Sequence, residues 1–319
     1  MRLVQSVFAV LFVASAPALA ETLSPSPAAL MRLRELRPSR LGVDRQGDLW
    51  SWNRTTGVIQ VLSHAGKLRI GPVVDGAACV DYDPEWGAVG LSSIGREMLF
   101  VGRGDAVMQR VLLPEQAASI CWVGASTVAV SPTFAAHRVK LWDLKTGLQV
   151  LTIGDEIPIR PHIGAVLART ILLHFDSRRE RLVTLDAFSG GLEVFSLAGK
   201  LLSRTTLPVP ESERRSVLDW LAQVDRQARE RSQVQTPILY YFSDVAIDER
   251  GDVWAVTERD RSRGRTTVAV AHENGKVDLQ TYETPNCCAP LLAVWGDQLV
   301  QYSDAVLSST FCVEERRIP

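Results

Sequence analysis

Four residues in two long connecting segments have the chemistry of a binding or catalytic site. Arg160 and His162 lie in the first segment, and Arg261 and Arg263 lie in the second. A guanidinium group binds a carboxylate or phosphate through two parallel hydrogen bonds, and a histidine exchanges a proton near neutral pH. These residues indicate either a site for an anionic ligand or a general base beside groups that stabilise an anionic intermediate.

Three aromatic residues in or near a predicted helix are further candidates for ligand or partner binding. Residues 211–232 place apolar side chains on one helical face and charges on the other, which predicts an amphipathic helix containing Trp220. Tyr240 and Tyr241 follow it. The helix either packs on the body of the protein or forms a lid or docking element. Simpler interpretations compete, because aromatic residues often lie in cores and acidic neighbours offset the charge of Arg261 and Arg263.

The cysteines suggest disulfides rather than a metal site. Zinc sites usually separate their thiols by about two to four residues and add further ligands, which the adjacent Cys287 and Cys288 do not match. In an exported chain Cys79 could pair with Cys121, and Cys287 or Cys288 with Cys312, which leaves at least one of the five cysteines unpaired. The alternative for Cys79 and Cys121 is that they are small buried apolar residues.

Composition and the motif search exclude several function classes. The chain of 319 residues is 46% hydrophobic and 22% charged, which is typical of a globular protein. A net charge of -1, without a block of basic residues, argues against nucleic acid as the partner. Nucleophile-elbow, zinc-hydrolase and glycine-rich phosphate motifs are absent from the sequence. We therefore expect no cofactor and assign no catalytic or metal-binding residue.

The elements that must position these residues follow from an internal repeat. Val43 to Trp50 returns later in the chain as Ile247 to Trp254. Each copy predicts a short strand, a tight Asp-x-x-Gly turn and a second strand that ends in tryptophan. Turn glycines recur at intervals close to the length of a four-stranded propeller blade, at Gly66, Gly104, Gly147 and Gly199.

The repeats predict an all-β fold, a six-bladed β-propeller of four-stranded antiparallel blades. The blades are expected near residues 40–75, 77–114, 117–154, 168–208, 238–284 and 287–316. The last blade has only three predicted strands, so we expect residues 30–36 to supply its outer strand and close the ring. A single domain then spans residues 30–319, with the helix at 211–232 inserted between two blades.

The repeated hairpins resemble those of known propeller families. Asp44 to Trp50 and its second copy are similar to the Asp-x-x-Gly-x-Leu/Ile-Trp repeats of NHL-type, virginiamycin-lyase-like and two-component-regulator propellers. Val139 to Asp143 resembles the end of a WD-repeat strand. The resemblance covers most of the chain and implies the fold. It leaves the function open, because such propellers include binders, scaffolds, lyases and hydrolases.

The N-terminus predicts export. Residues 1–20 have a basic Arg2, an apolar run from Leu3 to Ala14 and small residues at Ala18 to Ala20, as a secretory signal peptide does. The apolar run is shorter than the roughly 18 to 20 residues that cross a bilayer. Residues 21–29 are expected to form a linker. No later segment is a transmembrane candidate, so we expect a periplasmic or secreted protein.

These observations predict an exported, non-enzymatic propeller that binds a protein partner or a small-molecule ligand. By strand order, the helix and the two long connecting segments fall on one face of the ring, where we expect the site. One alternative is a propeller lyase or hydrolase with His162 as base at the channel mouth. The other is a structural subunit of an envelope complex.

Overall fold

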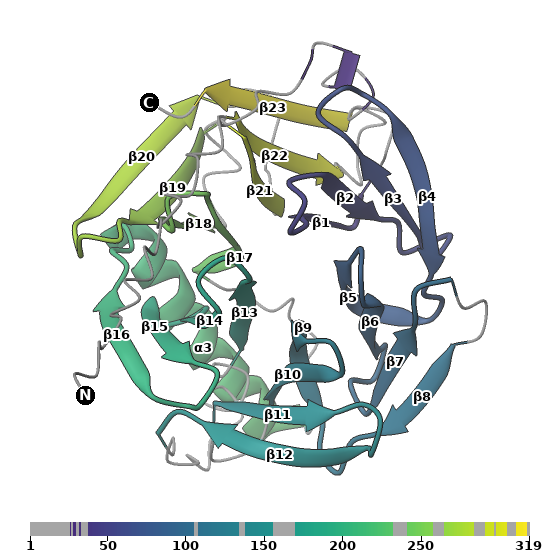
Figure 1. Cartoon of the computed structure of the whole chain (residues 1–319). Helices are drawn as coiled ribbons and strands as arrows, with labels where there is room; N and C mark the ends of the chain where they lie inside the picture. The colour runs from purple at the N-terminus through teal and green to yellow at the C-terminus, as the bar shows by residue number, and fades with distance from the viewer. Residues whose placement is uncertain are drawn as a thin grey trace, which may run out of the picture.

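The chain folds into a ring of antiparallel sheets around a central axis (Figure 1). The computed structural model describes residues 26, 28, 29, 32, 38–104, 108–133, 138–155, 170–231, 241–257, 265–283, 291–296, 298–304 and 311–317. Within these residues lie five four-stranded sheets and one three-stranded sheet. Consecutive strands of each sheet are neighbours, so each sheet is a simple meander.

The first three blades form the N-terminal half of the ring. The first consists of β1 (Arg40–Val43), β2 (Leu49–Trp52), β3 (Val58–Leu62) and β4 (Leu68–Val73). The second consists of β5 (Ala77–Asp83), β6 (Gly87–Ser92), β7 (Glu97–Val101) and β8 (Gln109–Leu112). The third consists of β9 (Ala117–Gly124), β10 (Thr127–Pro132), β11 (Val139–Asp143) and β12 (Leu148–Ile153).

The remaining blades form the C-terminal half of the ring. The fourth consists of β13 (Ile171–Asp176), β14 (Arg181–Asp186), β15 (Gly191–Ser196) and β16 (Leu201–Thr206). The fifth consists of β17 (Phe242–Ile247), β18 (Val253–Thr257), β19 (Arg265–Ala271) and β20 (Val277–Glu283). The sixth has β21 (Leu291–Trp295), β22 (Gln298–Asp304) and β23 (Phe311–Arg317). Thus the predicted propeller of four-stranded antiparallel blades is confirmed for five complete blades and a three-stranded sixth.

The first strand of each blade lies innermost and contacts its counterparts in the two neighbouring blades. These contacts run from β1 through β5, β9, β13 and β17 to β21, and β21 also contacts β1. In a meander around an axis, the turns between first and second strands all lie on one face. We call this the hairpin face, and the opposite face, which carries the connections between blades, the helix face.

The predicted outer strand at residues 30–36 is not found where it can be described. Arg32 is helical, as are Ala28 and Ala29, and the rest of that segment lies outside the described residues. Ala29 is fully buried in a cluster with Leu62 of the first blade and Trp295 of the sixth. Ala29 therefore packs at the junction of these two blades from a helical stretch of the chain. Residues 1–20, the predicted signal peptide, also lie outside the description.

The repeated hairpin forms because an aspartate organises its turn. Asp44 Oδ1 accepts hydrogen bonds from the backbone N–H groups two and four residues later, at 2.9 and 3.0 Å. Asp248 Oδ1 does the same at 2.9 and 2.9 Å. Gly47 and Gly251 close these turns with φ angles of 84° and 91°, in the left-handed region that favours glycine. The predicted repeat is thus confirmed in both copies.

Large side chains fill the wedges between blades. Six tryptophans of the blades are each at most 6% exposed, namely Trp50, Trp52, Trp122, Trp142, Trp254 and Trp295. Two indole N–H groups also bond a neighbouring blade, Trp122 to the Gly87 carbonyl at 3.1 Å and Trp295 to the Gly47 carbonyl at 3.0 Å. These tryptophans are therefore packing residues between the blades.

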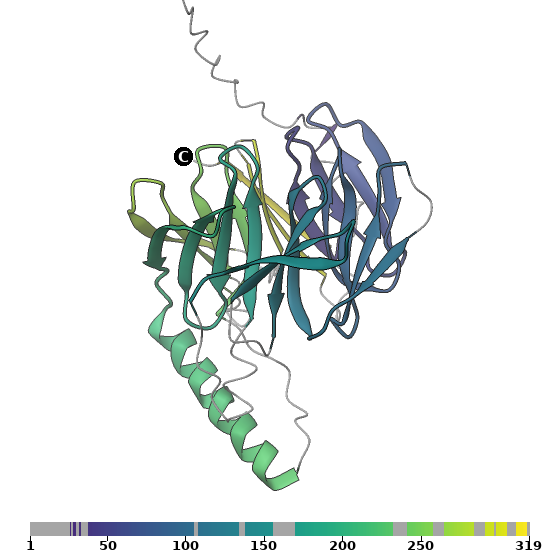
Figure 2. The same ribbon diagram turned by 60° about the horizontal axis from the view of Figure 1, so that its bottom comes forward.

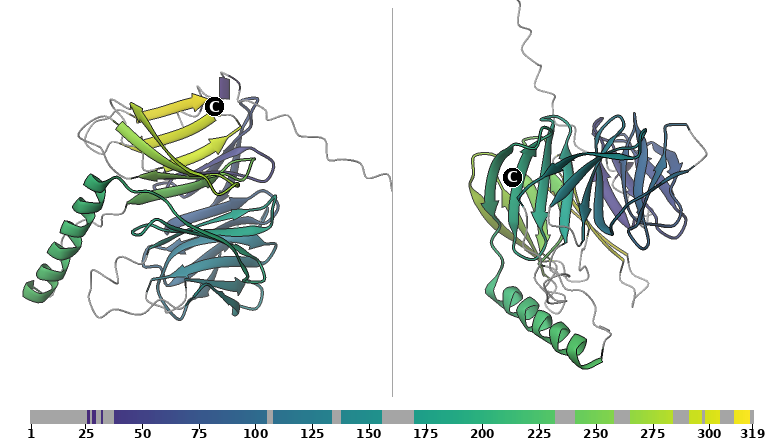
Figure 3. Two further views of the ribbon diagram at one scale, coloured as in Figure 1. Left: turned by 90° about the vertical axis from the view of Figure 1, so that its left-hand side faces the viewer. Right: turned by 90° about the horizontal axis from the view of Figure 1, so that it is seen from below.

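The predicted amphipathic helix is present as α3 (Glu211–Arg231), between β16 and β17. It extends away from the ring on the helix face (Figures 2 and 3). Val217, Trp220 and Val224 lie on its buried side, and they join the core cluster of the fourth and fifth blades. Among the described residues, no helix has the length and apolar character to cross a membrane.

Candidate functional site

Connected cavities follow the axis of the ring. Their volumes are about 50, 60 and 20 Å³. Val43 and His174 line all three, so the cavities adjoin one another, and we refer to them together as the channel. At the hairpin face, Arg45 and Ser177 line the two larger cavities and also a wider surface hollow of about 300 Å³. The channel therefore opens at the hairpin face.

An ion pair spans the channel toward the helix face. Arg40 Nη1 lies 2.7 Å from Asp244 Oδ1, and the Asp244 side chain is 1% exposed. The two residues hold equivalent places in β1 and β17, four positions before the turn aspartates Asp44 and Asp248. The sixth blade separates these strands, so the pair links blades that are not neighbours.

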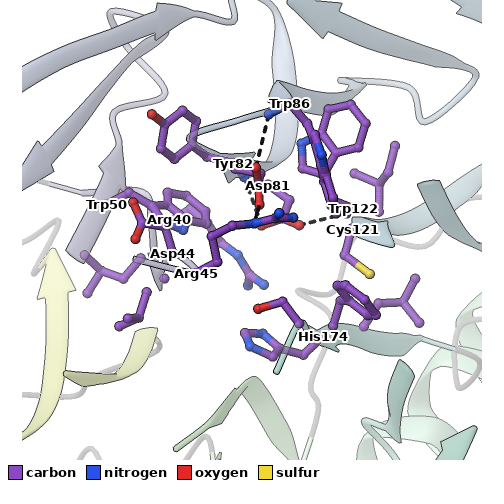
Figure 4. Close-up of a pocket in the computed structure, with 18 residues that line it drawn as sticks. Arg40, Asp44, Arg45, Trp50, Asp81, Tyr82, Trp86, Cys121, Trp122 and His174 are labelled. Carbon is purple, nitrogen blue, oxygen red and sulfur yellow. Dashed lines mark hydrogen bonds and ion pairs between the residues drawn. The ribbon is translucent and has the colours of Figure 1, made fainter. Parts of the chain in front are cut away.

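Side chains from four inner strands meet at the inner cavity of about 50 Å³. Figure 4 shows Arg40 of β1, Asp81 of β5, Cys121 of β9 and His174 of β13 around it. Asp81 Oδ2 accepts a hydrogen bond from the Trp122 backbone at 2.8 Å, and burial raises its pKa to about 6. Burial, and next the Arg40 charge, lower the pKa of His174 to about 4. His174 is therefore a neutral imidazole at pH 7.

The mouth of the channel is built from an arginine held against a tryptophan. The Arg45 guanidinium lies 3.8 Å from the centre of a Trp86 ring, within range of a cation–π interaction. It also pairs with Asp83 at 2.6 Å and with Glu85 at 2.8 Å. Phe175 lines both the channel and the adjoining hollow. The mouth thus offers aromatic surface beside fixed charges.

Most of the site residues predicted from the sequence lie outside the described residues. These are Arg160, His162, Tyr240, Arg261 and Arg263. Their assignment to a ligand or partner site stays a prediction.

Trp220 and Tyr241 attach α3 to the ring. Trp220 is 4% exposed and stacks on Phe188, with ring centres 6.2 Å apart. Tyr241 is 6% exposed, and its hydroxyl donates to the Arg214 carbonyl of α3 at 3.0 Å. Neither residue lines the channel cavities. Both therefore hold the helix base against the fourth and fifth blades.

Cys79 and Cys121, for which the sequence left both a disulfide and apolar packing open, are free thiols. Cys79 packs against the core cluster between the second and third blades, and Cys121 is buried in the cluster between the third and fourth. Burial raises the pKa of both thiols. Cys287 and Cys288 lie outside the description, and Cys312 lies in β23, for which only the backbone is described.

The channel residues themselves were missed by the sequence analysis. His174 looked like an ordinary residue of an apolar strand. Aligning the inner strands on the turn aspartates Asp83 and Asp176 places Asp81 and His174 at the same position, two residues earlier. Arg40 and Asp244 share the position four residues before their own turn aspartates. Polar residues recurring at these positions were the available signal.

Comparisons with known proteins support the fold alone. Neither a family model nor a curated protein matches this sequence. A member of the DUF4221 family from Bacteroides vulgatus has a TM-score of 0.56 at 8% identity, covering 88% of this chain and 93% of that one. A putative exported protein from Bacteroides fragilis has a TM-score of 0.54 at 9% identity, covering 84% and 80%. Selenomethionine-substituted virginiamycin B lyase from Staphylococcus aureus has a TM-score of 0.50 at 13% identity, covering 88% and 84%.

The expected resemblance to virginiamycin-lyase-like propellers is therefore confirmed at the level of fold. Identities this low carry no residue roles, and function has to be argued from the channel itself.

Removing one partner of the cross-channel ion pair should destabilise the protein strongly. Asp244→Ala leaves the Arg40 guanidinium partly buried without its carboxylate, and we expect a loss of about 3 kcal/mol in the free energy of unfolding, measured by urea denaturation. The double variant Arg40→Leu/Asp244→Leu should recover much of this loss. Arg110→Ala breaks an exposed pair with Glu97 and should cost about 1 kcal/mol or less. Equal effects of Asp244→Ala and Arg110→Ala would contradict a special role for the cross-channel pair.

The neutral state of His174 predicts a pH-dependent stability. Its pKa falls from 6.5 to about 4 on folding, so the unfolded chain binds this proton first as the pH falls. The stability of the wild type relative to His174→Gln should therefore decrease between about pH 6.5 and pH 4, as measured by thermal melts. The raised pKa values of Asp44 and Asp81 make the folded protein more stable as the pH falls, which is the opposite effect. Both carboxylates are present in the wild type and in His174→Gln, so their contribution cancels when the two proteins are compared.

His272 provides a control of opposite sign. Its ring nitrogens lie 2.7 Å from Asp252 and 3.0 Å from Asp278, and these carboxylates raise its pKa. Its stabilising contribution is present below its ordinary pKa and is lost as the pH rises through the raised value. The advantage of the wild type over His272→Gln should thus shrink with rising pH.

A pH-independent difference in stability between the wild type and His174→Gln would refute the burial of a neutral His174.

Proposed function

We propose that this protein is an exported, non-enzymatic β-propeller that binds a small polar ligand in its central channel. The main supporting observation is the convergence of Arg40, Asp81 and His174, from three different inner strands, on connected cavities. Ligand sites are concave and carry a few polar groups that fix orientation. The ligand enters from the hairpin face, because the Arg40–Asp244 pair spans the channel toward the other end.

The size of the cavities sets the shape of the ligand. The inner cavities of about 50 and 60 Å³ admit only a slender group. The adjoining hollow of about 300 Å³, lined by Trp86, Phe175 and Leu197, has room for the body of a small molecule. A ligand with one narrow polar end and an apolar or aromatic body fits both spaces.

Export is supported by two observations. Residues 1–20 have the pattern of a signal peptide. One protein of similar fold is described as a putative exported protein.

A lyase or hydrolase remains the alternative, and His174 is the observation in its favour. The neighbouring Arg40 could bind an anion, and the neutral imidazole of His174 could act as a base. Its pKa of about 4, however, makes it a weak proton acceptor at neutral pH, whereas an effective general base has a pKa near the working pH. The channel therefore favours binding over catalysis.

A second candidate function is the docking of a partner protein, or an envelope complex, on α3. Leu218 is 55% exposed on this helix, which extends from the ring (Figure 3). Affinity capture from an envelope fraction should retain a partner with the wild type and lose it with Leu218→Asp, while Val150→Asp on β12 serves as an equally exposed control. Identical capture by all three proteins would exclude this use of the helix.

Filling the channel mouth tests the proposed binding site. Ser177 lines the two larger cavities and the hollow, so Ser177→Trp should block entry. We expect a thermal-shift screen of small amines, organic acids and sugars to find a compound that stabilises the wild type and not Ser177→Trp. Leu218→Trp, on α3, should respond like the wild type. Stabilising compounds that are insensitive to Ser177→Trp, or the absence of any, would refute a ligand site in the channel.

A further inference from the structure

The repeated hairpins of the first and fifth blades differ at one carboxylate oxygen. In the fifth blade, the Trp254 indole N–H donates to Oδ2 of Asp248 at 3.2 Å. In the first blade, Asp44 is 7% exposed and its Oδ2 has no hydrogen-bond partner among the described residues. Buried polar atoms in folded proteins are rarely left unpaired, so this oxygen needs an explanation.

A glycine accounts for the difference. Gly42 lies opposite Trp50 in β1 and β2, as Ala246 lies opposite Trp254 in β17 and β18. A Cβ atom at position 42 would lie 2.6 to 2.7 Å from atoms of the Trp50 indole, closer than any contact allows. The ring therefore occupies space that a methyl group fills in the fifth blade, and Asp44 is left without the bond. Trp50 and Asp44 both line the inner cavity of Figure 4.

The charge balance of the channel is negative. Six carboxylates line its two larger cavities, from Asp44, Asp81, Asp83, Asp176, Asp248 and Glu249. Three guanidinium groups line them, from Arg40, Arg45 and Arg178, and each already pairs with a carboxylate. Asp44 and Asp81 have no ion-pair partner among the described residues, and burial raises the pKa of both to about 6. A bound cation would offset the free-energy cost of burying these two negative charges.

The hydrogen-bonding inventory agrees with the charge. The free oxygen of Asp44 accepts hydrogen bonds, and the neutral His174 ring has one unprotonated nitrogen that also accepts. A ligand group that bonds these two atoms must donate. A bare metal ion is disfavoured, because no group of three or more metal-ligating side chains occurs in the described part of the chain. The small cavity volumes favour an unbranched group.

We propose that the ligand enters the channel through a primary ammonium group on an unbranched carbon chain, and that Asp44 is its principal anchor. This inference rests on the channel being the ligand site. Asp44 receives the ammonium on Oδ2 while Oδ1 keeps the hairpin turn in place. His174 accepts a further hydrogen bond, and the aromatic side chains of the mouth contact the carbon chain.

Binding of n-butylammonium tests this assignment. Isothermal titration at pH 7.5 should detect binding of n-butylammonium to the wild-type protein and none of n-butanol or butyrate, which match its size. Asp44→Asn should lower the affinity at least tenfold, because the amide keeps an oxygen for the turn and loses the charge. Gly42→Ala should also weaken binding, because the methyl group displaces the Trp50 ring toward Asp44.

Asp186→Asn is the matched control. Asp186 Oδ1 caps its own turn through two backbone N–H groups at 2.9 and 3.1 Å, but it lies on the helix face and does not line the channel. This variant should bind n-butylammonium like the wild type. Absence of binding to the wild type, or equal affinity of Asp44→Asn and the wild type, would overturn the ammonium assignment. Binding of butyrate that is lost in Ser177→Trp would also overturn the ammonium assignment, but it would leave the channel as the ligand site. If no compound in the thermal-shift screen stabilises the wild type, both proposals are refuted.

Discussion

The ion pair between Arg40 and Asp244 makes the two ends of the channel different, because it spans only the end toward the helix face. It joins the inner strands of two blades that do not touch in the ring order, so it fixes the width of the ring at one end. A partly buried pair of this kind is expensive to desolvate and is kept only where both partners are well placed. Because the pair spans the channel toward the helix face, the free space and the uncompensated polar groups lie toward the other face.

The repeat explains how much of this arrangement could be predicted. Asp44, Asp248 and the glycines of their turns have local signatures, so the hairpins, the blades and the inserted helix follow from sequence. The channel residues do not, because both faces of an inner strand are covered by neighbouring blades. Alternation of apolar and polar residues then fails to mark the side nearest the axis, and His174 could not be told apart from a core histidine.

The remaining discrepancies also have physical causes. Residues 30–36 were expected to pair as a strand, whereas Arg32 is helical and Ala29, just before them, packs between the first and sixth blades. The site was expected beside the long connections of the helix face, and that prediction is untested because most of its residues lie outside the described part of the chain. Loop length carries no information about where a cavity forms. Short hairpin turns leave the opposite end of the channel open. Cys79 and Cys121 were near in register but lie in different inter-blade cores, which explains why they remain unpaired.

The bond from Trp295 to the Gly47 carbonyl has a consequence for biogenesis. It joins residues 248 positions apart, so the chain has to be almost complete before the two ends of the ring can meet. Closing so long a loop is entropically costly, and folds dominated by such contacts form slowly. During synthesis the side of the first blade that packs against the sixth would stay uncovered until the sixth blade is made. Contact between the sixth and first blades is therefore the step at which the newly made protein commits to its native state.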